Sequence, residues 1–372
     1  MIKYNTYAKI YLEADLKNYL RGNCFLKLHQ LNKYYWGGRY MKKFISLMLS
    51  FLLTSSLVVG CSNTEEDNKD EAKDVKKVTV NVGAPEGLPA IAIAKLAQEN
   101  PQIKENYEVK YTLEATSDAL STDVMKEGLD IAIVPSNMAS IAYNKTSNYQ
   151  IAGTVGMGSF YLVSSDEDIK GLDSSLEGKE VGNIGKGLTP DITVQALLKE
   201  KDVDLSKVTF NYSNEASDLV SLLATGKLTT GIVPEPALSG LLTKNPDLKV
   251  ICGVNDTWKD VFKNENGYPQ STLIIKTSFA KENGEFVESF IKSLDKNIQW
   301  TNKNPKEAGE FAAKFGVNIK APLLVKAIDR TNLKFIAIED SKDDYQKYFE
   351  ILNSFNAKVL GGKVPDENIF YK

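Results

Sequence analysis

The chain is poor in the side chains on which most enzyme and metal chemistry depends. It has a single histidine, His29, and only three cysteines, Cys24, Cys61 and Cys252. One histidine excludes Ser-His-Asp and Cys-His catalysis and any metal site built from several imidazoles. Three scattered cysteines form neither a disulfide framework nor a zinc-binding spacing. The sequence therefore predicts no metal, no cofactor and no imidazole-based catalytic site.

The main part of the chain also lacks an excess of basic residues. The formal net charge is -3, but after residue 60 the chain carries 36 Lys and Arg against 46 Asp and Glu, a net of -10. An acidic body argues against nucleic acid as a partner. With 42% hydrophobic and 25% charged residues, the composition predicts one or two packed domains.

One short apolar run near the start has the features of a secretion signal. Met41-Lys-Lys is followed by a mainly apolar run over 44–57 and then by Val-Val-Gly before Cys61. A basic start, a short apolar run and a small residue before the cut are typical of a secretory signal peptide. The run is shorter than the ~20 residues that a membrane-spanning helix needs. We therefore interpret residues 41–60 as a signal peptide.

The end of this signal resembles the lipobox of bacterial lipoproteins, in which the cysteine becomes the lipidated mature N-terminus. The resemblance implies lipid on Cys61 and a lipid anchor on the extracytoplasmic face of the cell membrane. Residues 1–40 do not fit this pattern, and they hold seven of the 17 tyrosines. We expect translation to start at Met41, so that residues 1–40 are a wrongly assigned upstream translation. Residues 61–77 are polar and charged, which predicts a flexible tether.

From residue 78 onward, strand-like and helix-like segments alternate, which predicts open, mostly parallel sheets covered by helices. The predicted strands cover 78–82, 107–113, 130–134, 180–184, 208–212, 229–233 and 248–252. The predicted helices between them cover 89–98, 119–126, 189–201, 216–224 and 237–244. The tail after Glu285 is predicted to be mainly helical, over 286–302, 305–315, 323–332 and 343–355.

Four loops rich in glycine and proline are the candidate ligand-binding segments. Residues 128–137 and 226–236 each contain a glycine turn, a short apolar strand and a proline loop that leads into a helix. Residues 83–89 and 185–190 follow the first strand of each half. Ligands of open α/β sheets bind beyond the carboxyl ends of the strands. Helix N-termini offer free N–H groups there, and these groups bind anions and polar groups.

At these loops the chain resembles the type II periplasmic solute-binding proteins of ABC importers. It is most similar to the branch that includes alkanesulfonate, nitrate and thiamine-pyrimidine binders. The resemblance covers about residues 78–330, and the segments that carry it are 83–95, 128–137, 185–198 and 226–238.

The resemblance implies an α/β fold with two lobes, each a mostly parallel sheet flanked by helices, and a ligand in the cleft between them. The two strands that cross between the lobes are expected near 153–161 and 268–275. Lobe one would then be 78–157 plus 272–372, and lobe two 158–271. The implied function is capture of a small anionic or heteroaromatic solute by hinge closure. The partners would be a cognate ABC permease and ATPase, and the protein would be a monomer without enzymatic activity.

We expect twelve residues at these loops and at the second crossing to bind the ligand. They are Glu86, Gly87, Leu88, Ser136, Asn137, Lys186, Gly187, Leu188, Thr189, Glu235, Pro236 and Tyr268. Lys186 could pair with an anion, and Glu235 could accept hydrogen bonds from a ring or amino N–H. Each also has a structural interpretation, Lys186 as a solvated loop lysine and Glu235 as a carboxylate at a helix N-terminus. Of Tyr268, Trp258 and Phe262, one could stack on a ligand, but core packing is the favoured role for the set.

Three other functions stay open at this stage. An enzyme on the same fold, similar to some enzymes of the menaquinone pathway, is disfavoured by the secretion signal and the missing imidazole. A ligand-sensing regulator would need a basic helix-turn-helix before residue 78, where the signal stands instead. A surface lipoprotein without a ligand would show no stabilisation by any solute.

Overall fold

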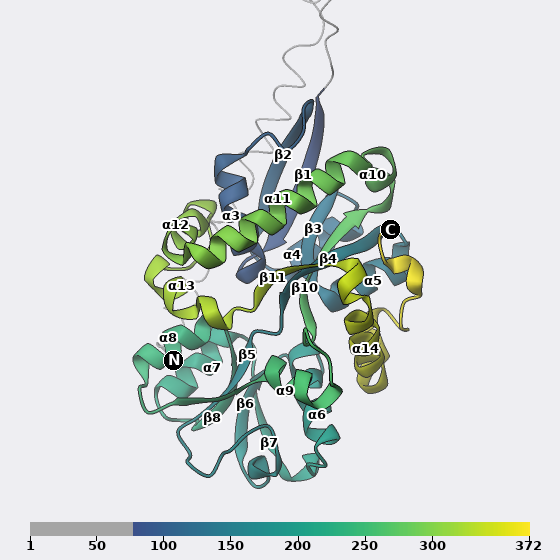
Figure 1. Cartoon of the computed structure of the whole chain (residues 1–372). Coiled ribbons are helices and arrows are strands. Elements are labelled where there is room, and N and C mark those ends of the chain that lie inside the picture. The colour runs from purple at the N-terminus through teal and green to yellow at the C-terminus, as the bar shows by residue number, and fades with distance from the viewer. Residues whose placement is uncertain (1–76) are drawn as a thin grey trace, which may run out of the picture. The chain divides into compact units, whose positions relative to one another are not determined.

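The structure is a computed structural model that describes residues 77–372 (Figure 1). The expected upstream segment, the signal peptide and Cys61 all lie outside the described residues, as does the tether except for Lys77. Residues 77–372 belong to one compact unit. No helix among them is long and apolar enough to cross a membrane.

Lobe one, as we use the term, is the part built on a six-stranded sheet with the strand order β11-β4-β10-β3-β1-β2. The strands are β1 (Val78–Pro85), β2 (Tyr107–Glu114), β3 (Ile131–Pro135), β4 (Tyr149–Met157), β10 (Pro269–Lys276) and β11 (Leu333–Ala337). The helices are α3 (Leu88–Glu99), α4 (Ser117–Met125), α5 (Ser136–Thr146), α10 (Thr277–Glu282), α11 (Gly284–Lys303), α12 (Pro305–Phe315), α13 (Ala321–Ala327) and α14 (Ile338–Asn356). Figure 1 shows the long helix α11 running across these strands, and it packs against α3 and β11.

Lobe two is the part built on a five-stranded sheet with the order β7-β6-β8-β5-β9. Its strands are β5 (Phe160–Ser164), β6 (Glu180–Ile184), β7 (Thr209–Ser213), β8 (Thr230–Pro234) and β9 (Lys249–Gly253). Its helices are α6 (Thr189–Glu200), α7 (Ala216–Ala224), α8 (Ala237–Lys244) and α9 (Val254–Phe262).

The predicted two-sheet α/β fold is confirmed, and the strand directions add detail to it. β1 is parallel to β2 and β3, and β6 is parallel to β7 and β8. The strand that follows each crossing runs the other way: β10 is antiparallel to β3 and β4, and β5 is antiparallel to β8 and β9. The repeated glycine-strand-proline segments are β3 and β8, which occupy equivalent places in the two sheets.

The predicted tail is wrong at one point. The helix expected over 323–332 ends at Ala327, and the chain continues as a short 3-10 turn and then as the edge strand β11. The Thr331 hydroxyl donates to the Ile328 carbonyl, and Asn332 has a φ of 49°. Because residues other than glycine rarely adopt positive φ, and never in a continuing helix, the helix cannot extend past this point.

The two lobes are connected by two crossings that lie against each other. In the first, Gly158 and Ser159 join β4 to β5, and in the second, residues 263–268 lead from α9 into β10, whose first three residues, 269–271, we count with this crossing. The Gly158 N–H donates to the Tyr268 carbonyl over 3.1 Å. A Cβ at Gly158 would lie 2.1 Å from the Tyr268 ring, so only glycine permits this approach.

Candidate ligand site

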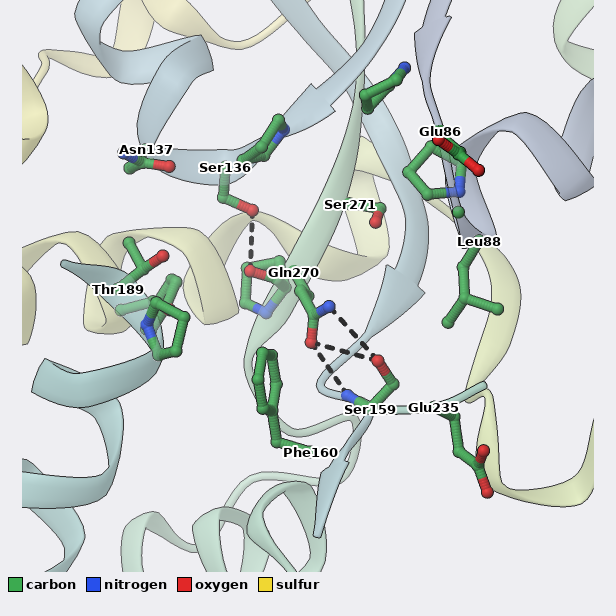
Figure 2. A pocket seen from close by; sticks show the side chains of 17 residues that line it. Glu86, Leu88, Ser136, Asn137, Ser159, Phe160, Thr189, Glu235, Gln270 and Ser271 are labelled. Carbon is green, nitrogen blue, oxygen red and sulfur yellow. Dashed lines mark hydrogen bonds between the residues drawn. The ribbon is translucent and has the colours of Figure 1, made fainter. Parts of the chain in front are cut away.

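A cavity of about 280 Å³ lies at the carboxyl ends of the strands and is lined by both lobes and both crossings (Figure 2). From lobe one it is lined by Pro85, Glu86, Gly87, Leu88, Pro89, Pro135, Ser136, Asn137 and Tyr348. From lobe two it is lined by Phe160, Thr189, Pro190 and Glu235. The crossings add Ser159, Pro269, Gln270 and Ser271. A cleft with this position is where open α/β proteins bind small molecules.

Seven of the twelve predicted residues lie together in this lining. They are Glu86, Gly87, Leu88, Ser136, Asn137, Thr189 and Glu235. The other five, namely Lys186, Gly187, Leu188, Pro236 and Tyr268, are not part of the lining. The structure therefore brings the loops at 83–89 and 128–137 to the cavity through several residues each, the loop at 185–190 through its last two, and the loop at 226–236 through Glu235 alone.

The loop at 185–190 turns its lysine away from the cavity. The Lys186 ammonium lies over the Tyr212 ring, 5.4 Å from its centroid. Gly187 donates its N–H to Asp191, and Leu188 is 53% exposed. Only Thr189 and Pro190, at the start of α6, reach the cavity. In this structure the expected pairing of Lys186 with an anion therefore has no geometric support.

Tyr268 belongs to the core behind the cavity. It is buried among Trp258 and Tyr348, with ring centroids 5.4 Å and 5.3 Å away. It is not among the lining residues, and burial raises the pKa of its hydroxyl well above the ordinary value. Tyr268 and Trp258 therefore pack in the core, which is one of the two roles that the sequence left open for them.

Glu235 lines the cavity, but its carboxylate binds protein groups. Oε2 accepts from the Ser239 N–H over 3.0 Å, and Oε1 accepts from the Ser239 hydroxyl over 2.9 Å and from Nε of Arg330 over 2.6 Å. Figure 2 shows the carboxylate pointing away from the other labelled side chains. The Glu235 side chain is fully buried, whereas that of Arg330 is 31% exposed.

Because Arg330 lies after α13 in lobe one, this ion pair connects the two lobes. The Arg330 Nη2 also donates to the Ser239 hydroxyl over 2.8 Å. The Arg330 carbonyl accepts from the Tyr161 hydroxyl over 2.9 Å, and burial raises the pKa of Tyr161 to about 12. Glu235 therefore fixes the wall of the cavity and leaves little hydrogen-bonding capacity for a ligand.

Ser136 has a similar positioning role. It is 2% exposed, and its hydroxyl donates to the Pro269 carbonyl over 2.7 Å and contacts the Thr272 hydroxyl at 2.8 Å. These contacts hold the start of β10 against α5. A buried hydroxyl that already donates one hydrogen bond and contacts a second hydroxyl has little hydrogen-bonding capacity left for a ligand.

The free polar groups of the cavity are on other residues. Among residues 77–372, no hydrogen bond uses the side chains of Asn137, Thr189 or Ser271. Glu86 is exposed, and one of its oxygens accepts from the Asn318 N–H over 3.0 Å. Phe160 and Leu88 contribute apolar surface (Figure 2), together with the prolines of the lining.

The sequence reasoning missed Ser159, Phe160, Gln270, Ser271 and Tyr348 as lining residues. The first four lie inside the segments predicted to cross between the lobes, so the location was available although the role was not. Tyr348 lies on α14, more than a hundred residues from the other lobe-one loops, and no local pattern points to the cavity.

The comparisons with known proteins agree with this architecture. Residues 157–308 match the model of the family described as NMT1/THI5 like. An ABC transporter structure from Parabacteroides distasonis is 24% identical, with a TM-score of 0.68, and the match covers 79% of this chain and 99% of that one. No curated protein matches the sequence significantly.

Two further similar structures are of proteins named for the solutes that they bind. The periplasmic aliphatic sulphonate binding protein SsuA of Escherichia coli is 14% identical, with a TM-score of 0.64 and coverage of 79% of this chain and 92% of that one. The periplasmic nitrate-binding protein NrtA of Synechocystis is 13% identical, with a TM-score of 0.55 and coverage of 77% and 84%. The chain has the fold of type II periplasmic binding proteins, as the resemblance predicted, and identities at this level establish the fold and not the ligand.

Proposed function

We propose that this protein is the extracytoplasmic substrate-binding component of an ABC importer. The observation that supports the proposal best is the cavity, which takes its lining from two lobes joined by only two crossings. Such a geometry lets hinge closure surround a ligand and exclude water. Among the solved structures with the same fold, one is named as an ABC transporter and two as periplasmic sulphonate- and nitrate-binding proteins, and this favours binding over enzymatic turnover. Permease and ATPase partners follow from the same proposal.

We infer further that the ligand is a small polar heteroaromatic molecule, neutral or cationic, and not an anion. No lysine, arginine or histidine lines the cavity. Its two charged lining residues are Glu86 and Glu235, and only Glu235 has a cationic partner, Arg330. An anion in the cavity would therefore meet the carboxylate of Glu86 without a compensating cation.

The helix N-termini do not reverse this balance. α3, α5 and α6 all begin at the cavity, but α3 and α6 have Pro89 and Pro190 in their first two positions. Proline has no N–H, so each of these helices offers one donor fewer to an anion. A helix terminus contributes about 0.3–1 kcal/mol to a nearby anion, which is less than a charged hydrogen bond of about 1.5–3 kcal/mol.

Calorimetry with 4-aminopyrimidine, ethanesulfonate and nitrate tests the ligand class. We expect one-to-one binding of the pyrimidine and no measurable binding of the two anions. Binding of an anion without binding of the pyrimidine would overturn the ligand class. If no solute in a broad panel binds and none co-purifies, the function as a binding protein is wrong.

Substitution of Glu86 by glutamine gives a second test at the same site. The amide oxygen can still accept from the Asn318 N–H, so the change removes the charge and keeps that contact. We expect the pyrimidine to lose about 1.5–3 kcal/mol of binding free energy, the range for a hydrogen bond to a charged group. Glu108→Gln, on the exposed side of β2, is the matched control and should leave binding unchanged.

We also propose that the protein is held on the extracytoplasmic face of the membrane by lipid on Cys61. The proposal rests on the signal-like sequence over 41–60 and the Val-Val-Gly before the cysteine. A tether over 61–77 would separate the binding lobes from the membrane surface.

A further inference from the structure

Gln270 joins the two crossings and also lines the cavity. It is the second residue of β10 on the second crossing, and its side chain reaches Ser159 on the first. The Ser159 N–H donates to Oε1 of Gln270 over 2.9 Å, and Nε2 of Gln270 donates to the Ser159 hydroxyl over 3.2 Å. The Ser159 hydroxyl also contacts Oε1 at 3.5 Å. Figure 2 shows the amide among the lining side chains, turned toward Ser159.

The orientation of this amide is fixed by chemistry. A backbone N–H can only donate, so the Gln270 oxygen must face the Ser159 N–H, and the amide nitrogen must take the other position. The Ser159 carbonyl in turn accepts from the Glu235 N–H over 2.9 Å. The Ser159 peptide is therefore held on both sides, and flipping the Gln270 amide would place its N–H₂ against another donor.

This orientation leaves one donor of Gln270 without a protein partner. The amide nitrogen carries two N–H groups, and within residues 77–372 its one hydrogen-bond acceptor is the Ser159 hydroxyl. Because Gln270 lines the cavity, the second N–H is available to a ligand. A ligand atom opposite it must be an acceptor, since a donor there would leave both groups unpaired.

We propose that Gln270 is a specificity-determining residue, which recognises a hydrogen-bond acceptor such as a ring nitrogen on the bound heteroaromatic ligand. This inference rests on the proposed function and on its ligand class. Since the same amide ties the two crossings together, a ligand that engages it contacts the hinge directly.

The test compares two probes on one protein. 4-Aminopyrimidine and aniline share an amino group and a six-membered aromatic ring, and both are uncharged at neutral pH, but aniline has no ring nitrogen. We expect the wild type to bind the pyrimidine about ten-fold or more tightly than aniline, because the ring nitrogen accepts a hydrogen bond from Gln270 whereas aniline leaves this donor unpaired.

Two variants then identify the residue responsible. Gln270→Leu and Gln270→Met each remove the donor and the acceptor of the amide without adding charge. We expect the ratio of the two affinities to fall close to one in both variants, because neither variant offers a donor to the ring nitrogen. A change in folding or in cleft closure would affect both probes alike and leave this ratio unchanged. Gln299→Met, on the exposed side of α11, is the control and should keep the wild-type preference.

The outcomes separate this inference from the proposed function. If the wild type binds both probes and the variants keep the full preference for the pyrimidine, Gln270 does not recognise the ring nitrogen, and the inference alone fails. If the wild type binds neither probe, the ligand class fails and this inference fails with it. A circular dichroism melt of each variant confirms that a lost preference is measured on folded protein.

Discussion

Replacing Arg330 by methionine removes the cation that connects lobe one to the buried carboxylate of Glu235. Methionine keeps much of the side-chain volume, so the main change is loss of the 2.6 Å contact to Glu235 and the 2.8 Å contact to Ser239. Removing one partner of a fully buried ion pair costs about 3–5 kcal/mol, because the other charge stays buried. The Arg330 side chain is 31% exposed, and solvent screens that side of the pair.

We therefore expect Arg330→Met to lower the free energy of unfolding by about 2–3 kcal/mol, below the range for a fully buried pair. Glu235→Gln should cost less, about 1–2 kcal/mol, because an amide can keep some of the hydrogen bonds. The double variant should cost less than the two single costs together, by about 1.5 kcal/mol or more, as expected for residues in contact.

Urea unfolding of the four proteins measures this cycle. Lys326→Met is the control, since Lys326 is exposed on the preceding helical turn and has only a 3.5 Å contact to Thr243 across the lobes. It should change stability by no more than about 0.5 kcal/mol. If the costs of Arg330→Met and Glu235→Gln add within about 0.5 kcal/mol, the pair does not couple the lobes and the reasoning is refuted.

Three further predictions concern the anchor, the titration of one buried acid and metal independence. Cys61→Ala should abolish lipid labelling and leave the protein released or as its precursor, and a variant that is still labelled would contradict the lipid site. Burial raises the pKa of Asp344, although Asn266 and Asn264 donate to it. The folded chain therefore holds a proton at pH values where the unfolded chain has lost it, so this group's contribution to stability rises as the pH falls through the raised pKa. In urea unfolding, the free energy of unfolding of the wild type should rise relative to that of Asp344→Asn as the pH falls from neutral to mildly acidic. For Glu350→Gln, which is exposed on the same helix, the difference from the wild type should not change with pH. A constant difference for Asp344→Asn as well would contradict the shift. Chelator treatment should leave the melting temperature unchanged, because residues 77–372 contain no cluster of three or more potential metal ligands, and a marked fall would show a structural metal.

The order of strands and helices could be predicted from the sequence because each element has a strong local pattern. β3, for example, is a run of apolar residues with a glycine turn before it and Pro135 at its end, and all but its last residue are buried. The helix α6 starts at Thr189 with Pro190 in its first turn, where proline is favoured. Patterns of this kind depend only on neighbours in the chain, and the structure confirms them.

The location of the site could also be predicted, but the direction of individual side chains could not. Both Lys186 and Glu235 are on the predicted loops, yet Lys186 lies over Tyr212 and Glu235 binds Arg330. Each of these partners comes from an element distant in sequence or in another lobe. The sequence pattern states where a loop is, and the tertiary contacts decide which of its side chains remain free for a ligand.

The strand β11 shows the same limit for the fold. Residues 323–332 have a helical composition, but the chain leaves the helix after Ala327, and Leu333–Ala337 pairs with β4 at the edge of the first sheet. Pairing with a strand that lies far away in sequence outweighs a local helical preference, as tertiary context often does.

Native mass spectrometry of the purified full chain tests the central claim most directly. The account predicts one small molecule bound per protein, lost on denaturation, with a polar heteroaromatic ring and no acidic group. The cavity of about 280 Å³ limits its size. An anionic molecule in that position would contradict the ligand class. A chain that carries no molecule, and whose melting temperature no solute raises, would contradict the claim that this protein binds a ligand at all.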